Sequence, residues 1–167
     1  MSDWRALEIY ATFMKVTGEL EVIGHERLTD SVNRFGDYMH LRNARAEPLS
    51  ENSPVISRIE ERTTVAKAAM IMVCPVEDLE DGSNRRMWRE KDIQPVSIST
   101  AAYTLVADVH VEPRRSLQDQ LERFRGDFLP VTNVSALWVA ALESETHALQ
   151  RPFALLNPSA ILSFSQR

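Results

Sequence analysis

The stretch RSLQDQLERFRGDFLPVTNVSA, residues 115–136, repeats an earlier stretch of the same chain, RLTDSVNRFGDYMHLRNARA, residues 27–46. The identical residues at an offset of 89 include Leu28 and Leu117, Asp30 and Asp119, Arg34 and Arg123, and Phe35 and Phe124. After one inserted residue, Gly126, the offset becomes 90, and Asn43 aligns with Asn133. An internal repeat indicates two similar structural units, so it is the first guide to the fold.

The two copies share the spacing of their apolar residues even where the residues differ. Apolar and polar positions alternate along 16–22 and along 105–111, which is typical of a half-buried strand. A spacing of i, i+4 and i+7 then places three apolar side chains on one stripe of a short helix. These positions are Leu28, Val32 and Phe35 in the first copy and Leu117, Leu121 and Phe124 in the second. Each copy therefore changes from a strand to a helix at the same place.

The start of each helix carries an acidic residue. In the second copy Ser116 is followed three residues later by Asp119, which predicts a capping box with Asp in place of Glu. The first copy has Arg27 at the cap position and shares only the acid, Asp30. Two carboxylates could act as acid and base if a cleft brought them together. An acid in the first turn also stabilises a helix through its dipole, and we interpret both residues in that way.

Beyond the helix, the alternation of apolar residues slips by one position in both copies. The slip falls near Arg42-Asn43 and Thr132-Asn133 and predicts a β-bulge at each place. Asn suits such a site because it tolerates a left-handed backbone and hydrogen-bonds its neighbours. Residues 65–73 and 156–164 then align at an offset of 91 as closing strands. The predicted unit is therefore strand, helix, bulged strand, strand, strand.

The segment 77–97 separates the copies and has the turn-forming residues and proline of a linker. We therefore predict a first unit at 1–76 and a second unit at 98–167. A unit of about 70 residues buries little surface alone, so the two units are expected to pack together. The predicted fold class is α+β, mainly β, with the two tandem repeats forming a pseudo-twofold pair of strongly curved sheets or small barrels. Further apolar residues that could cover part of the joint are Trp4, Leu7, Ile9, Tyr10 and Phe13.

The composition limits the class of protein. Of the 167 residues 44% are hydrophobic, and the formal net charge is -5. This acidic balance argues against nucleic acid as a partner, because such binding depends on Lys and Arg at phosphates. The apolar run 68–76 is far shorter than the roughly 20 residues that cross a bilayer, and the first residues lack the pattern of a signal peptide. We expect a cytoplasmic protein with no membrane segment, in which the single cysteine, Cys74, is a buried apolar residue.

Few residues suggest chemistry beyond architecture. The histidines His25, His40, His110 and His147 do not have the spacing of metal ligands. The sequence contains no phosphate-binding loop and no recognisable nucleophile motif. We therefore predict no catalytic residue, no metal site and no cofactor.

The segment between the copies contains a basic cluster around a tryptophan: Arg85, Arg86, Trp88 and Arg89. Guanidinium groups beside an indole can bind a phosphate or stack on a base. The same composition is also typical of a solvated loop anchored by its tryptophan, because acidic residues on both sides neutralise the charge. These four residues are the candidate binding residues of the chain.

The closing stretch PFALLNPSAILSFS, residues 152–165, resembles the last two strands of Sm-like small β-barrels, in which a tight turn leads into an apolar strand. A short helix followed by bent strands is also similar to that family. The resemblance implies a small barrel and, in the family, RNA binding. Sm-like chains begin with the helix, whereas here a strand precedes it, so the topology would have to be permuted. No RNA-contacting residue of the family has a counterpart that we can place in this sequence.

The sequence favours a non-catalytic protein that binds a protein partner or assembles with itself through its sheet edges. A duplication supplies two equivalent surfaces and no asymmetric reactive centre. Two alternatives stay open: a Sm-like protein that binds nucleic acid, and an enzyme whose site lies at the interface of the repeats. A continuous basic surface would favour the first, and a deep pocket with titratable groups of shifted pKa would favour the second.

Overall fold

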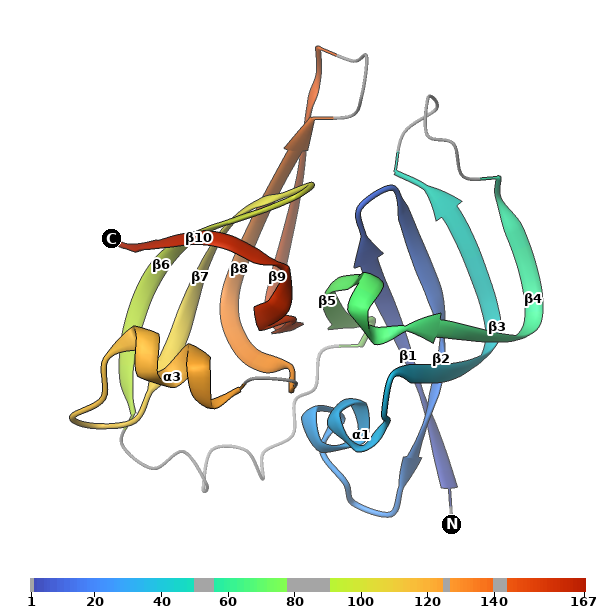
Figure 1. Cartoon of the computed structure of the whole chain (residues 1–167). Helices are drawn as coiled ribbons and strands as arrows, with labels where there is room; N and C mark the ends of the chain where they lie inside the picture. Colours follow the sequence, from blue (N-terminus) through green and yellow to red (C-terminus); the bar gives the residue numbers. More distant parts are fainter. Residues whose placement is uncertain (1, 50–55, 78–90, 125–126, 140–143) are drawn as a thin grey trace.

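The computed structural model describes residues 2–49, 56–77, 91–124, 127–139 and 144–167. The ten strands in these residues form one open antiparallel sheet that is neither closed nor strongly curled. Two short α-helices lie beside it (Figure 1). The chain is therefore mainly β, as predicted. Within the described residues no helix is long and apolar enough to cross a membrane.

Each half of the chain contributes five strands and one α-helix. The first repeat consists of β1 (Ser2–Ala11), β2 (Met14–Ile23), α1 (Leu28–Arg34), β3 (Tyr38–Pro48), β4 (Arg58–Ala66), the 3-10 helix η1 (Lys67–Ala69) and β5 (Met70–Pro75). The second repeat consists of β6 (Asp92–Thr100), β7 (Thr104–Val111), α3 (Leu117–Arg123), β8 (Leu129–Val139), β9 (Thr146–Leu156), the 3-10 helix η2 (Pro158–Ala160) and β10 (Ile161–Gln166). The order in the sheet is β5-β1-β2-β3-β4 in the first repeat and β10-β6-β7-β8-β9 in the second, so the predicted internal repeat is confirmed.

The strand registers also agree between the repeats. Val16 pairs with Ala46 in the first repeat, and Leu105 pairs with Ala136 in the second. The pair Arg42 and Arg62 likewise corresponds to the pair Thr132 and Phe153. We call a residue of the second repeat equivalent to a residue of the first when their numbers differ by a fixed offset. The offset is 89 for first-repeat residues up to 35, 90 for residues 37–48, and 91 for residues 58–76. Every strand pairing within the two repeats follows this equivalence.

Both predicted β-bulges are confirmed. The register between β2 and β3 shifts between Thr17 and Glu19, and the register between β7 and β8 shifts at the equivalent place. Asn43 and Asn133 have φ angles of 48° and 51°, in the left-handed region. Asn43 Nδ2 donates to Glu19 Oε2 at 3.1 Å, and Asn133 Nδ2 donates to Asp108 Oδ2 at 2.7 Å. The same amide-to-carboxylate hydrogen bond thus fixes each bulge.

The repeats are joined head to tail, and this overturns the pseudo-twofold arrangement that we expected. The full order of the sheet is β10-β6-β7-β8-β9-β5-β1-β2-β3-β4. Strand β5 of the first repeat therefore pairs with β9, which is the equivalent of β4. A twofold axis would instead pair β5 with β10 or β4 with β9. The expected pair of strongly curved sheets or small barrels is also wrong, because the repeats share one open sheet (Figure 1).

Each repeat has one more strand than we predicted. Strand β1 pairs with β2 and β5, and its equivalent β6 pairs with β7 and β10. The residues expected to cover the joint, 4–13, therefore lie largely within β1. Strand β6 begins at Asp92, so residues 92–97, which we expected in the linker, belong to the sheet. The unit boundaries 1–76, 77–97 and 98–167 otherwise stay a prediction.

The sheet has two buried apolar clusters, one in each repeat. In the first cluster, residues of β1 to β3 and α1 pack together with Phe128 and Leu155 of the second repeat. In the second cluster, residues of β6 to β9 and α3 pack together with first-repeat side chains, namely Tyr10, Ile71, Met72 and Cys74. Each core therefore contains side chains from the other repeat. The two halves pack as one body, as the size of a single unit led us to expect.

Candidate functional site

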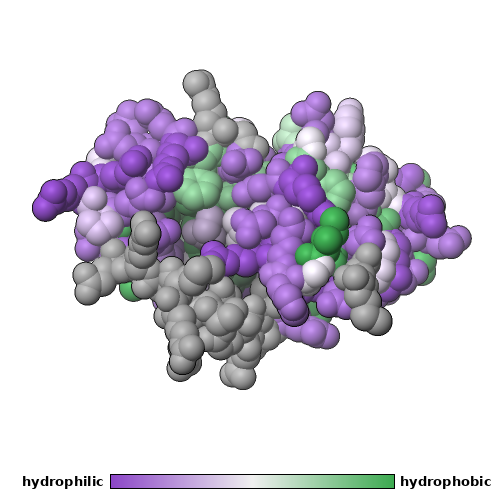
Figure 2. Space-filling view, turned by 90° about the horizontal axis from the view of Figure 1, so that it is seen from below, coloured by the Kyte–Doolittle hydropathy of each residue, from purple (hydrophilic) through white to green (hydrophobic). Residues whose placement is uncertain are grey.

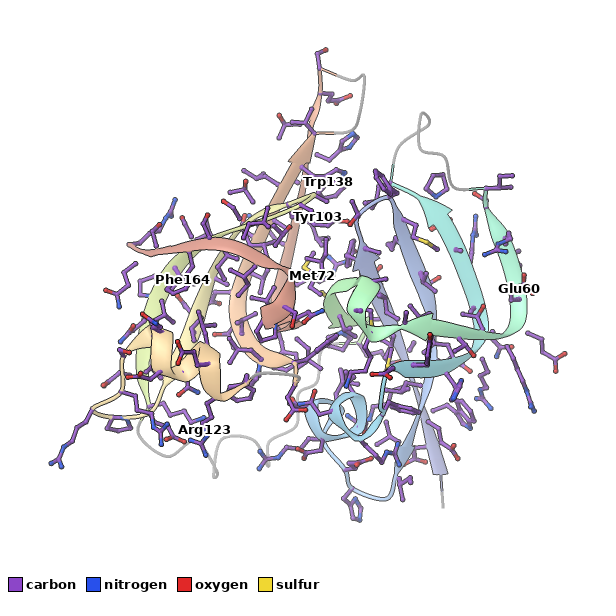
Figure 3. All side chains as sticks on the ribbon, in the orientation of Figure 1. Glu60, Met72, Tyr103, Arg123, Trp138 and Phe164 are labelled. Atoms are coloured by element: carbon purple, nitrogen blue, oxygen red, sulfur yellow. The ribbon has the colours of Figure 1, made fainter. Side chains whose placement is uncertain are left out.

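The joint between the repeats is a short antiparallel pairing of β5 with β9. Met72 lies opposite Leu156 and Val73 opposite Leu155, and each of these four side chains is at most 1% exposed. Figure 3 shows Met72 near the centre of the molecule, between the two halves of the sheet. Burial of a large apolar side chain stabilises a protein by about 1.5–3 kcal/mol, so these residues hold the joint firmly.

Asn157, directly after β9, fastens the joint by hydrogen bonds. Its backbone N–H donates to the carbonyl of Ile71 at 2.9 Å. Its side-chain amide donates to the carbonyls of Met70 and Lys67, at 2.8 Å and 3.3 Å. The amide oxygen accepts from the N–H of Ser159 at 3.0 Å. Asn157 is only 6% exposed, and its amide satisfies buried carbonyls that a smaller side chain would leave unpaired.

A second set of contacts joins helix α1 to Phe128, the residue directly before β8. The side chain of Asn33 accepts from the N–H of Phe128 at 2.8 Å and donates to its carbonyl at 3.3 Å. Lys67 Nζ lies 5.5 Å from the centre of the Phe128 ring and donates to the carbonyl of Phe35 at 3.0 Å. Phe128 is thereby held in the core of the first repeat.

A partly buried polar cluster spans the same joint. Arg151 on β9 donates to Glu8 Oε2 on β1 at 2.6 Å, and the hydroxyl of Tyr10 donates to the same oxygen at 2.9 Å. Lys15 Nζ lies 3.5 Å from Glu8 Oε1. Burial raises the pKa of Glu8, but the hydrogen bonds and positive charges around it outweigh burial, so the net pKa is lowered. Burial and then the bond to Glu8 raise the pKa of Tyr10. These directions keep the carboxylate charged and the phenol protonated at neutral pH, as suits a structural ion pair.

An open groove of about 530 Å³ lies beside this cluster and is lined by both repeats. Trp138 forms one wall, stacked on His147 with ring centres 5.4 Å apart and in edge contact with Tyr103 at 5.6 Å. Trp138 Nε1 is buried and has no hydrogen-bond partner among the residues that the structure describes. The charged residues that line the groove are Lys15, Glu47 and Arg151. Lys15 pairs with Glu47, and Lys15 and Arg151 both pair with Glu8 beside the groove. The groove therefore presents an apolar wall and charged side chains that are already paired.

The surface seen from the helix side is mainly hydrophilic, with hydrophobic residues in small separate patches (Figure 2). The two edges of the sheet differ from this surface. Among the strands that the structure describes, the edge strands β4 and β10 each have one neighbour, β3 and β6 respectively. An edge strand presents backbone N–H and C=O groups to which another strand can bond.

The edges also expose large apolar side chains. Ile59 on β4 is 80% exposed, and Leu162 and Phe164 on β10 are 72% and 39% exposed. Figure 3 shows Glu60 of β4 and Phe164 of β10 on opposite sides of the molecule. The free strands β4 and β10 are moreover the equivalents of β9 and β5, the two strands that form the joint. The candidate site of this protein is therefore the pair of free edges.

The residues predicted to bind an anion, Arg85, Arg86, Trp88 and Arg89, lie outside the described residues, and their role stays a prediction. Asp30 and Asp119 lie in the first turns of α1 and α3, as we interpreted them. Burial raises the pKa of the Cys74 thiol to about 12, in agreement with the expected buried apolar residue.

The residues that fasten the joint, Asn157, Asn33, Glu8 and Arg151, were missed from the sequence. Their partners are 87 to 143 positions away along the chain, and a local pattern does not reveal such a distance. One signal was present, because Asn157 precedes Pro158 and Ser159 and such a turn often uses the Asn side chain.

Comparisons with protein-family models, with curated proteins and with solved structures found no match to this chain. The resemblance to Sm-like barrels therefore stays a prediction.

Proposed function

We propose that this chain is a non-catalytic assembly protein whose binding surfaces are the two free edges of its sheet, β4 and β10. One observation supports the proposal above the others. The chain already joins two of its own units edge to edge through β9 and β5, and the equivalents of both strands have no second neighbour among the described strands. Strands β10 and β4 could therefore pair between molecules in the way that β5 and β9 pair between the repeats.

The sequences of the free edges suit strand pairing. Strand β10, ILSFSQ, contains no charged residue and no proline. Strand β4 carries charges at its start, but its last four residues, Thr63–Ala66, are uncharged. This end of β4 corresponds to the end of β9 that pairs with β5. Edges protected against association usually carry lysine, proline or a bulge. Neither segment contains lysine or proline, and β10 has one register shift, between Ile161 and Ser163.

The polar cluster at the joint supports a non-catalytic function. A general acid or base needs a pKa near the working pH. The pKa of Glu8 is lowered and that of Tyr10 is raised, so both pKa values move away from neutral pH. The arrangement resembles a fastening between repeats more than a reactive centre.

Light scattering over a range of protein concentrations tests the proposal. The mass should rise above that of the 19.0 kDa monomer as the concentration increases. Replacing the exposed edge residue by a charge, Leu162→Lys, should return the protein to a monomer. Ile23→Lys is the matched control, because Ile23 is 58% exposed on β2, a strand inside the sheet. A wild-type mass that stays monomeric at every concentration would contradict the proposal.

A further inference from the structure

We infer that the partner of each edge is a second copy of this chain, with β10 of one copy pairing with β4 of the next in the register of the internal joint. This inference rests on the proposed function and specifies it. It depends on the equivalence of the repeats, which holds for every strand pair within them.

The equivalence fixes the register. The joint pairs Met72 with Leu156 and Val73 with Leu155. The equivalents of these residues place Ser163 of one copy opposite Val65 of the next, and Phe164 opposite Thr64. The N–H of Asn157 donates to the carbonyl of Ile71 within the joint. Its counterpart between copies is the N–H of Ala66 donating to the carbonyl of Leu162.

The pairing explains three exposed apolar side chains. Tyr38, Leu162 and Phe164 are 59%, 72% and 39% exposed. Their equivalents at the joint, Phe128, Ile71 and Val73, are 2%, 4% and 0% exposed. The internal joint thus buries the positions that the outer edges leave open. A second copy in the same register would cover all three.

The two outer edges also carry charges of opposite sign. The negative charge is on β4 and the positive charge is near β10, whereas at the joint the positive charge is on β9 and the negative charge is on β1. At the joint, Arg151 on β9 meets Glu8 on β1. The equivalent of Arg151 is Glu60 on β4, and the equivalent of Glu8 is Ser97 on β6. The guanidinium Nε of Arg167 donates to Ser97 Oγ at 3.2 Å, so a positive charge lies where Glu60 of a second copy would arrive.

The association between copies should be weaker than the joint, and it should continue beyond a dimer. The outer pairing has Thr64, Val65 and Ser163 in place of Leu155, Leu156 and Met72, and it lacks an equivalent of the Asn157 amide because Ala66 stands there. Less apolar surface is therefore buried. A head-to-tail interface leaves a free edge at each end, so it builds rings or filaments, whereas an edge that pairs with itself stops at a dimer.

Disulfide cross-linking tests the register. Val65 and Ser163 would lie opposite each other between copies, as their equivalents Leu156 and Met72 do at the joint. Leu156 and Met72 form a pair without direct backbone hydrogen bonds. The Cα atoms of such a pair are about 4.5 Å apart, which lies within the range of a disulfide. The double variant Val65→Cys/Ser163→Cys should give a ladder of dimers, trimers and larger species on oxidation. Each single variant should stay monomeric on a non-reducing gel. Cys74 is buried and is kept in all variants.

Two results would overturn the inference while leaving the proposed function intact. Dimers formed by a single variant would show that an edge pairs with its own kind. A double variant that does not cross-link, although light scattering shows association, would show that the register is different. A protein that does not associate at all would instead remove the proposed function.

A second variant tests the same register by strengthening it. Ala66→Asn places an amide where Asn157 stands in the joint, opposite the carbonyls of Pro158 and Ile161 in the next copy. Association should then be half-complete at about tenfold lower concentration, as expected for about 1.4 kcal/mol of added hydrogen bonding. Ala66→Ser, whose side chain is too short to reach both carbonyls, is the matched control. An Ala66→Asn variant that associates no better than wild type would count against the register.

Discussion

Asn43 and Asn133 hold the backbone in the left-handed region at equivalent bulges, with φ angles of 48° and 51°. Residues with a Cβ atom generally pay about 1–2 kcal/mol for this conformation, and Asn is one of the exceptions. Each side chain also donates to a carboxylate on the neighbouring strand, Glu19 or Asp108. The bulges thus depend on two properties of one residue type, its backbone tolerance and its amide.

The two properties can be separated by substitution at Asn133. Asn133→Ala removes both and should lower the free energy of unfolding by about 1–2 kcal/mol. Asn133→Gly keeps the backbone tolerance and removes only the amide, so it should cost less than the alanine variant. Urea denaturation of both variants measures the difference. Equal losses would show that the left-handed conformation contributes nothing.

Glu8 makes stability depend on acidic pH. Its folded-state pKa lies below the ordinary value of 4.5, so its contribution is present above pH 4.5 and is lost as the pH falls through the folded pKa. Glu8→Gln should lower the free energy of unfolding at neutral pH by about 2 kcal/mol and should flatten its fall below pH 4.5. Glu21→Gln, at an exposed position on the interior strand β2, is the control and should follow the wild-type curve. Identical acid profiles for Glu8→Gln and wild type would refute this role.

The residue patterns that predicted the bulges and the capping box were local. Asn43 and Asn133 mark a slip in the alternation that is visible within a few residues, and Ser116 and Asp119 are three residues apart. The ion pair of Glu8 and Arg151 joins residues separated by 143 positions, and nothing near either residue indicates the other. Local geometry could therefore be predicted, and the fastening of the joint could not.

At the scale of the elements, the helices α1 and α3 begin differently although they are equivalent. Ser116 caps α3: its hydroxyl accepts from the N–H of Asp119 at 3.1 Å, and its own N–H donates to Asp119 Oδ2 at 3.3 Å. The Ser116 hydroxyl also donates to Asp119 Oδ2, at 2.7 Å, and this bond together with that from the Ser116 N–H lowers the pKa of Asp119. Arg27 at the start of α1 makes no side-chain cap. The predicted capping box is therefore confirmed, and only the second repeat has one.

Removing the cap should loosen α3. Ser116→Ala should cost about 1 kcal/mol in the free energy of unfolding, because the first-turn N–H loses its acceptor. Ser116→Thr keeps a hydroxyl at the cap and should lose clearly less. Chemical denaturation followed by circular dichroism compares the two. If Thr is as costly as Ala, the hydroxyl is not the stabilising group.

Strands β1 and β6 are the elements that the sequence did not reveal. The alternation of β1 is disturbed because both of its faces are covered: Leu7 and Ile9 lie in one core and Tyr10 in the other. Strand β6 alternates clearly at Val96 and Ile98, but it follows a charged and turn-rich segment that suggested a linker. A strand buried on two sides does not give a simple period of two.

At the scale of the whole molecule, the joint depends on Asn157, whose amide bonds two carbonyls of the other repeat. Asn157→Ala should lower the free energy of unfolding by about 2 kcal/mol, because buried carbonyls lose their donors. Ser159→Ala is the control: Ser159 is exposed, contacts Asn157 through its backbone N–H, and its change should stay within about 0.5 kcal/mol. Thermal unfolding measures both variants. A loss for Asn157→Ala no larger than the control would show that the amide does not fasten the joint.

The repeat itself could be read from the sequence, but its assembly could not. The spacing of apolar residues indicates which face of a strand or helix lies against a core. For β4 this spacing is the same whether the edge of the strand meets water or another strand. A choice between a twofold and a head-to-tail joint depends on which edges pair. That choice lies in contacts such as Val73 with Leu155, which join residues 82 positions apart.

The central claim is that β4 and β10 are the binding surfaces of the molecule. Hydrogen exchange at these two edges tests it most directly. Amide exchange followed by mass spectrometry would be compared in dilute and concentrated solutions of the wild-type protein. We predict that peptides covering Thr63–Ala66 and Ile161–Gln166 become protected together as the concentration rises, while peptides from the interior strands β2 and β7 do not change. Exchange at both edges that is independent of concentration, or protection that appears at one edge alone, would contradict the account.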